Sequence, residues 1–80
     1  MPNPTKFRQD STLIALGKAI RSKRKEQGVS QEKLAFLAGI DRSYIGRVER
    51  GDNNVAILTL QKIAMALEIS LSNLLEKAEL

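Results

Sequence analysis

One segment constrains the fold of this chain more than any other: residues 31–50, QEKLAFLAGIDRSYIGRVER. Apolar side chains recur there at helical spacing on both sides of Gly39, which supplies the backbone freedom that a sharp turn needs. Two short helices, Gln31 to Ala38 and Arg42 to about Arg50, are therefore predicted to meet at a tight turn. That arrangement is the signature of a helix-turn-helix, and a plain helical hairpin is the alternative.

The apolar positions of this segment have separate physical reasons. Ala35 must be small because the following helix crosses close to it, and Ile40 fills the turn. Ile45 and Val48 form the buried face of that following helix. Its remaining side chains are predicted to be exposed and are mostly able to donate hydrogen bonds: Arg42, Ser43, Tyr44, Gly46, Arg47 and Arg50.

A longer helix is predicted before this segment, from about Ser11 to Gln27. Ser11 is the expected N-cap, and Gly28 stands where a helix-ending glycine belongs. Residues 1–10 contain two prolines and no helical period, so we expect a flexible arm there, followed by a single domain at 11–80. Lys6 and Arg8 give this arm two positive charges.

Two more helices are predicted after the segment, from about Leu58 to Leu67 and from Leu71 to about Glu79. Ser70 caps the last of them, whereas the start at Leu58 lacks an obvious capping side chain. No segment shows the alternation of a strand, so the predicted fold class is all-α, with five helices.

Composition excludes several classes of function. The chain contains no cysteine and no histidine, which removes thiolate ligands, disulfides, the commonest metal ligand and the usual general base. The nine acidic residues are scattered singly. We therefore expect neither an enzyme nor a cofactor or metal site.

Apolar runs in this chain are short. None approaches the roughly 18 residues that a membrane-spanning helix needs, and the first residues lack the pattern of a signal peptide. The expected location is the cytoplasm, with no membrane partner.

Positive charge is concentrated in the first part of the chain. Residues 1–50 contain eleven lysines and arginines and five acidic residues, whereas residues 51–80 contain two and four. Such an asymmetry is typical of a protein with a polyanionic partner, of which nucleic acid is the common one. A solvated, charged helix face is the alternative.

From Leu16 to Leu75 the chain resembles the lambda-repressor-like, Xre-type family of helix-turn-helix regulators. Lys23 and Ala56 depart from the family pattern, which usually has an apolar residue and a serine or threonine there. Within the family, Asp41 to Ile45 and Val48 to Arg50 are similar to restriction–modification controller proteins. The matching residues are Leu16-Gly17, Ile20-Arg21, Arg24, Gly28 to Glu32, Leu34-Ala35, Gly39-Ile40, Tyr44-Ile45, Val48 to Gly51, Leu60, Ile63-Ala64, Ala66-Leu67 and Leu74-Leu75.

The resemblance implies that the protein binds double-stranded DNA and regulates transcription. The residues that would read base edges in the major groove are Arg42, Ser43, Tyr44 and Arg47. Those that would contact the DNA backbone are Ser30, Gln31, Arg50, Asn53 and Asn54. Arg24 and Glu49 match positions that we interpret as an internal ion pair or cap. Tyr44 packing into the core is the alternative to its DNA contact.

Homodimerisation is expected, because one recognition helix reads only a few base pairs and a dimer would read a near-palindromic site. Apolar residues in and before the last predicted helix would form its interface: Ile69, Leu71, Leu74, Leu75 and Ala78. No small-molecule ligand is expected. The alternative function is a protein-interaction module of the same fold, such as an antitoxin or anti-repressor, that uses Phe36 and the last helix.

Overall fold

The computed structural model describes residues 10–80, which form helices and connecting turns. The helices are α1 (Ser11–Glu26), α2 (Gln31–Ala38), α3 (Arg42–Arg50), α4 (Ile57–Ala66) and α5 (Leu71–Lys77). The all-α, five-helix prediction is confirmed for this part of the chain. No helix among these residues is both long and apolar enough to cross a membrane.

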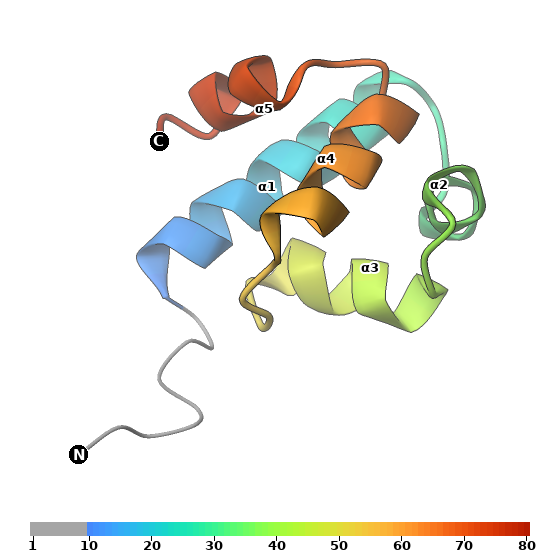
Figure 1. The fold of residues 1–80 in the computed structure, drawn as a ribbon, viewed down its shortest axis with the longest axis horizontal. Helices are drawn as coiled ribbons and strands as arrows, with labels where there is room; N and C mark the ends of the chain where they lie inside the picture. The colour runs from blue at the N-terminus through green and yellow to red at the C-terminus, as the bar shows by residue number, and fades with distance from the viewer. Residues whose placement is uncertain (1–9) are drawn as a thin grey trace.

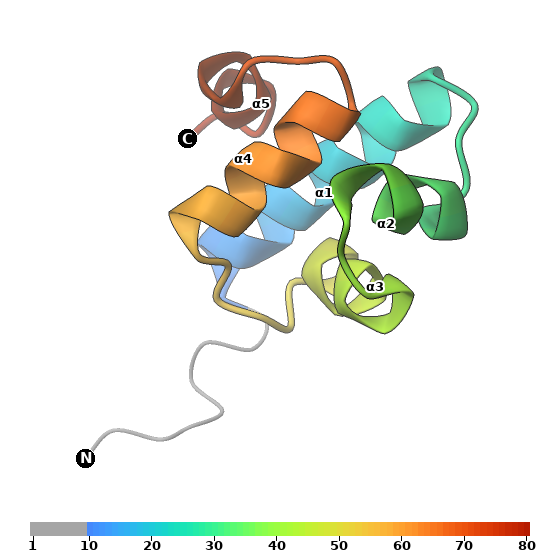
Figure 2. The same ribbon diagram turned by 45° about the vertical axis from the view of Figure 1, so that its right-hand side comes forward.

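Helix α1 lies at the centre of the fold. It packs against α3 on one side and α5 on the other, as Figures 1 and 2 show. Helix α2 packs against α3 and α4, and α4 also contacts α5. The side chains buried between the helices form one apolar core: Leu16, Ala19, Ile20, Leu34, Ala35, Ile45, Val48, Leu60, Ile63, Ala64, Leu67, Leu74 and Ala78.

Local signals in the sequence set the ends of α2. The Ser30 hydroxyl accepts a hydrogen bond from the backbone N–H of Lys33 at 3.0 Å, which caps the first turn. Gly39 ends the helix in the left-handed conformation, with φ of 69°, which costs glycine little. Both bounds of α2, and those of α3, fall where the sequence predicted them.

The start of α1 differs from the prediction. Asp10, not Ser11, is the N-cap, because its carboxylate accepts from the backbone N–H of Thr12 at 2.9 Å. Asp10 therefore belongs to the helix terminus and not to the predicted arm. The rest of that arm, with Lys6 and Arg8, lies outside the described residues.

Small boundary differences occur elsewhere. Helix α1 ends at Glu26, one residue before the prediction, and α5 ends at Lys77, two residues before it. Helix α4 begins at Ile57 with Ala56 as its N-cap, and no side chain caps it, in keeping with the missing signal in the sequence. Lys23 stays partly exposed, with its Nζ 3.9 Å from a Glu26 oxygen, so no lysine charge is buried there.

Candidate nucleic-acid interface

A polar pocket lies at the N-terminus of α2, beside the start of α3. Its volume is about 560 Å³, and its lining residues come from α1, α2, α3 and the α2 cap: Arg24, Ser30, Gln31, Glu32 and Arg42. Three of these residues, Ser30, Gln31 and Arg42, were predicted to contact DNA. The free N–H groups and positive dipole end of a helix N-terminus favour an anion, and Arg42 adds a positive charge.

Gln31 is held in this pocket by a buried ion pair. Arg24 donates from Nε to Glu49 Oε2 at 2.7 Å and from Nη2 to Glu49 Oε1 at 3.0 Å. Gln31 Nε2 donates to the same Oε1 at 3.0 Å. The interpretation of Arg24 and Glu49 as an internal ion pair is confirmed, and this pair joins α1 and α3 to the first residue of α2.

The outer face of α3 carries the predicted base-reading residues. Arg42, Ser43 and Arg47 are exposed, whereas Tyr44 is half-buried and packs against the core. The Arg47 guanidinium lies over the Tyr44 ring, 5.6 Å from its centroid, which favours a fixed position for the arginine. The expected packing of Tyr44 against the core is therefore confirmed in part, and its contact with DNA stays a prediction.

Asp41 lies directly before α3. It is the N-cap by backbone conformation, but its side chain caps no N–H of the helix. Its carboxylate instead accepts a hydrogen bond from the Ser43 hydroxyl, which lowers the pKa of Asp41 below its ordinary value. An ionised acceptor therefore lies beside the exposed arginines of α3.

The remaining residues that were predicted to contact the DNA backbone lie at the other end of α3. Arg50 is exposed and its Nε donates to Asp52 Oδ2 at 3.2 Å. Asn53 is half-buried and Asn54 is exposed, both in the loop before α4. These residues lie at the C-terminal end of α3, opposite the pocket at its N-terminal end.

Gly46 does not lie on the exposed face of α3, so that part of the prediction is wrong. It is buried, and a Cβ placed there would lie 3.3 Å from Arg50 Nη1 and 3.8 Å from Gln31 Oε1. Helix α3 packs against both α1 and α2, and this leaves a narrower exposed face than a single buried stripe would.

The predicted dimer residues divide between the core and the surface. Leu74 is fully buried and Ala78 nearly so, because α5 closes the core against α1 and α4. Neither side chain can therefore be a main contact for a second chain, which corrects the prediction at these two positions. Ile69, Leu71 and Leu75 are half-buried and retain accessible surface.

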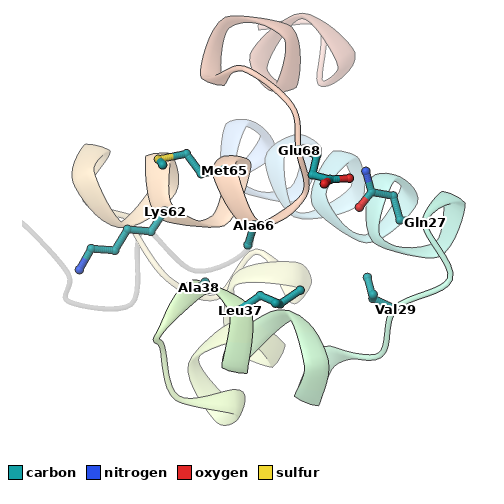
Figure 3. Close-up of a pocket in the computed structure, with 8 residues that line it drawn as sticks. All are labelled: Gln27, Val29, Leu37, Ala38, Lys62, Met65, Ala66 and Glu68. Carbon is teal, nitrogen blue, oxygen red and sulfur yellow. The ribbon is translucent and has the colours of Figure 1, made fainter.

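A groove between α2 and α4 was not predicted from the sequence. Its volume is about 800 Å³, and Figure 3 shows the residues that line it: Gln27, Val29, Leu37, Ala38, Lys62, Met65, Ala66 and Glu68. Leu37 and Met65 are exposed on it, and Phe36 is 77% exposed nearby on α2. From the sequence alone, an apolar side chain that lines a groove cannot be distinguished from one at the edge of the core.

The fold and the interface define a helix-turn-helix protein. The chain belongs to the helix-turn-helix family, whose profile matches residues 20–74. The resemblance to the Xre-type regulators is thereby confirmed. A DNA-binding transcription regulator is the class of protein that these matches support, and the family is a regulatory one and not an enzyme family.

Two relatives of this chain are control proteins. The chain is 44% identical over 62 residues to control protein C.SmaI of Serratia marcescens, a match that covers 78% of this chain and 74% of that protein. Control protein C.BamHI of Bacillus amyloliquefaciens is 38% identical over 64 residues, covering 79% of each chain.

The chain is also similar to solved structures of regulatory proteins. The controller protein C.AhdI from Aeromonas hydrophila superposes with a TM-score of 0.80 at 46% identity, covering 81% of this chain and 98% of that one. The clp gene regulator ClgR of Corynebacterium glutamicum superposes with a TM-score of 0.81 at 32% identity, covering 85% and 88%.

Proposed function

We propose that this protein is a cytoplasmic, sequence-specific transcription regulator that binds a near-palindromic DNA site as a homodimer, in the manner of a restriction–modification controller. One observation carries the proposal. The exposed arginines of α3 adjoin the polar pocket at the N-terminus of α2, and Arg42 belongs to both. A phosphate in the pocket would set the register of α3 in the major groove.

Base reading rests on the outer face of α3. Arg42 and Arg47 are the donors suited to a bidentate contact with guanine, and each such contact discriminates by about 1–3 kcal/mol. Ser43 donates to Asp41, so its hydroxyl oxygen is left to accept from a base. The contacts with the DNA backbone are proposed to come from residues near the two ends of α3: Ser30, Gln31, Arg50, Asn53 and Asn54.

Selection from random duplex DNA, followed by fluorescence anisotropy, tests DNA binding. Arg47→Ala is expected to weaken binding to the selected sequence and to relax preference at one position of each half-site. Lys62→Ala, which removes the same charge from the outer face of α4, is the matched control and should bind like the parent. Equal binding of Arg47→Ala and the parent to selected and scrambled DNA would contradict the assignment of α3.

Salt dependence tests the phosphate contacts separately. Each neutralised phosphate contributes about −0.9 to the slope of log affinity against log salt concentration. A slope near zero would contradict the electrostatic part of the proposal. A stoichiometric protein partner together with absent DNA binding would favour the protein-interaction alternative.

The second copy is proposed to contact the accessible side of α5, where Leu71 and Leu75 keep exposed surface. Leu75→Glu is expected to shift sedimentation from dimer to monomer and to weaken binding to a palindromic site far more than to a half-site. Phe36→Glu places the same charge on an exposed apolar residue of α2 and is the control. Sedimentation of the parent as a monomer at micromolar concentration would contradict the dimer.

A further inference from the structure

Glu49 does more than its ion pair with Arg24 requires. The pair already uses both carboxylate oxygens, at 2.7 and 3.0 Å, and the Glu49 side chain is only 3% exposed. Yet Oε1 accepts a further hydrogen bond from Gln31 Nε2 at 3.0 Å. A carboxylate at the end of α3 thus holds the first side chain of α2, eighteen residues earlier in the chain.

This bond determines which way the Gln31 amide points. An ionised carboxylate only accepts, so the amide nitrogen must face Glu49 and the amide oxygen must face Gly46. The second N–H of Nε2 is left for an acceptor outside this pair. Gln31 lines the polar pocket at the α2 N-terminus, so this N–H is available to an anion there.

Arg24 makes this arrangement compatible with a phosphate. A lone carboxylate beside the pocket would repel an anion, but the bidentate guanidinium compensates its charge. Arg24 also donates from Nη1 to the carbonyl of Val29 at 3.0 Å, which fixes the chain just before α2. The ion pair therefore supports the pocket without adding negative charge to it.

We propose that Glu49 is a positioning residue that acts on DNA through Gln31. It holds the Gln31 amide in the orientation that presents an N–H to a phosphate. The Gln31 side chain is therefore already ordered before DNA binds, and binding does not have to order it. The inference rests on the proposed DNA-binding function. Ordering one flexible side chain on binding costs a factor of roughly two to ten in affinity, and this is the effect to be measured.

Replacing Glu49 alone would leave the buried Arg24 unpaired, so the test replaces the pair. Arg24→Met with Glu49→Met removes both charges at similar volume, a change that buried ion pairs often tolerate. Anisotropy on the selected DNA compares the parent, Gln31→Ala, the double variant and the triple variant. Circular dichroism and thermal unfolding check that each is folded.

The expected result is non-additivity. The double variant and Gln31→Ala should each weaken binding by a factor of about two to ten, and the triple variant should bind no more weakly than the double. If Gln31→Ala has its full effect in the Met background, Glu49 does not position Gln31 and the inference is overturned. Failure of the parent to bind any selected DNA would overturn the proposed function itself.

A measurement on the parent keeps the inference testable if the double variant does not fold. Side-chain amide NMR should show slowed proton exchange for Gln31 without DNA, because one N–H is bonded to Glu49. Gln61, which is exposed on α4, is the internal control and should exchange as a free amide. Equal exchange of Gln31 and Gln61 would overturn the inference.

Discussion

Helix α1 holds α3 and α5 on its two sides by different means (Figure 1). Toward α3 it offers a glycine in close backbone contact and the buried Arg24–Glu49 pair. Toward α5 it offers apolar side chains around Leu74 and the exposed ion pair of Lys77 with Glu26, at 2.8 Å.

The difference concerns direction. Backbone contact and bidentate hydrogen bonds fix both distance and angle, whereas apolar burial depends mainly on area and volume. Helix α3, which we propose reads DNA, is therefore held rigidly relative to α1 and α2. Helix α5 is held by burial, and changes that conserve volume should be tolerated there.

Gly17→Ala should have the largest effect, because it breaks the contact of α1 with α3. A Cβ at this position would lie 2.5 Å from the carbonyl oxygens of both Val48 and Glu49. These are backbone atoms of α3, so the helices must separate, at an expected cost of about 3 kcal/mol or more. Chemical denaturation measures the change in the free energy of unfolding. A loss below about 1 kcal/mol would show that α1 and α3 can separate at little cost.

Leu74→Ala tests the side of α1 that faces α5. Leu74 is fully buried, so its truncation leaves a cavity that is expected to cost about 2–3 kcal/mol. Leu74→Met keeps the volume and should cost less than about 1.5 kcal/mol. A Met variant as unstable as the Ala variant would mean that α5 is held as specifically as α3.

The same comparison explains how much could be predicted from sequence. The bounds of α2 and α3 depend on local signals, Ser30 and Gly39 among them, and the sequence predicted them correctly. Which face of α5 meets the core depends on distant helices, and the three leucines of so short a helix fit several orientations. Leu74 was therefore assigned to the wrong side.

The candidate interface divides in the same way. The exposure of Arg42, Ser43 and Arg47 follows from the buried positions of Ile45 and Val48 on the same helix. The bond between Gln31 and Glu49 joins two helices that meet only in the folded chain, and residue spacing does not reveal it. Burial of Gly46 likewise requires knowing that two helices cover α3.

Lys77→Gln tests the exposed pair and should have a small, pH-dependent effect. The hydrogen bond and charge of Lys77 lower the pKa of Glu26 below the ordinary glutamate value of 4.5. A lowered pKa in the folded state stabilises the protein above pH 4.5, and this stabilisation is lost as the pH falls through the folded pKa. Melting temperatures of parent and variant should differ slightly at neutral pH and converge in acid. Curves that stay parallel down to pH 3 would show that Lys77 does not act through Glu26.

Gly46→Ala should have the smallest effect, and of opposite sign, although Gly46 is buried in a helix like Gly17. Alanine favours a helix over glycine by roughly 0.5–1 kcal/mol. The new Cβ would lie 3.3 Å from Arg50 Nη1, the far end of a flexible side chain that can move by a few tenths of an ångström. The expected result is therefore a slightly raised melting temperature. A loss of stability would mean that Arg50 is held as firmly as the backbone beside Gly17. The rigidly held part of α3 would then include this exposed side chain as well as the buried face.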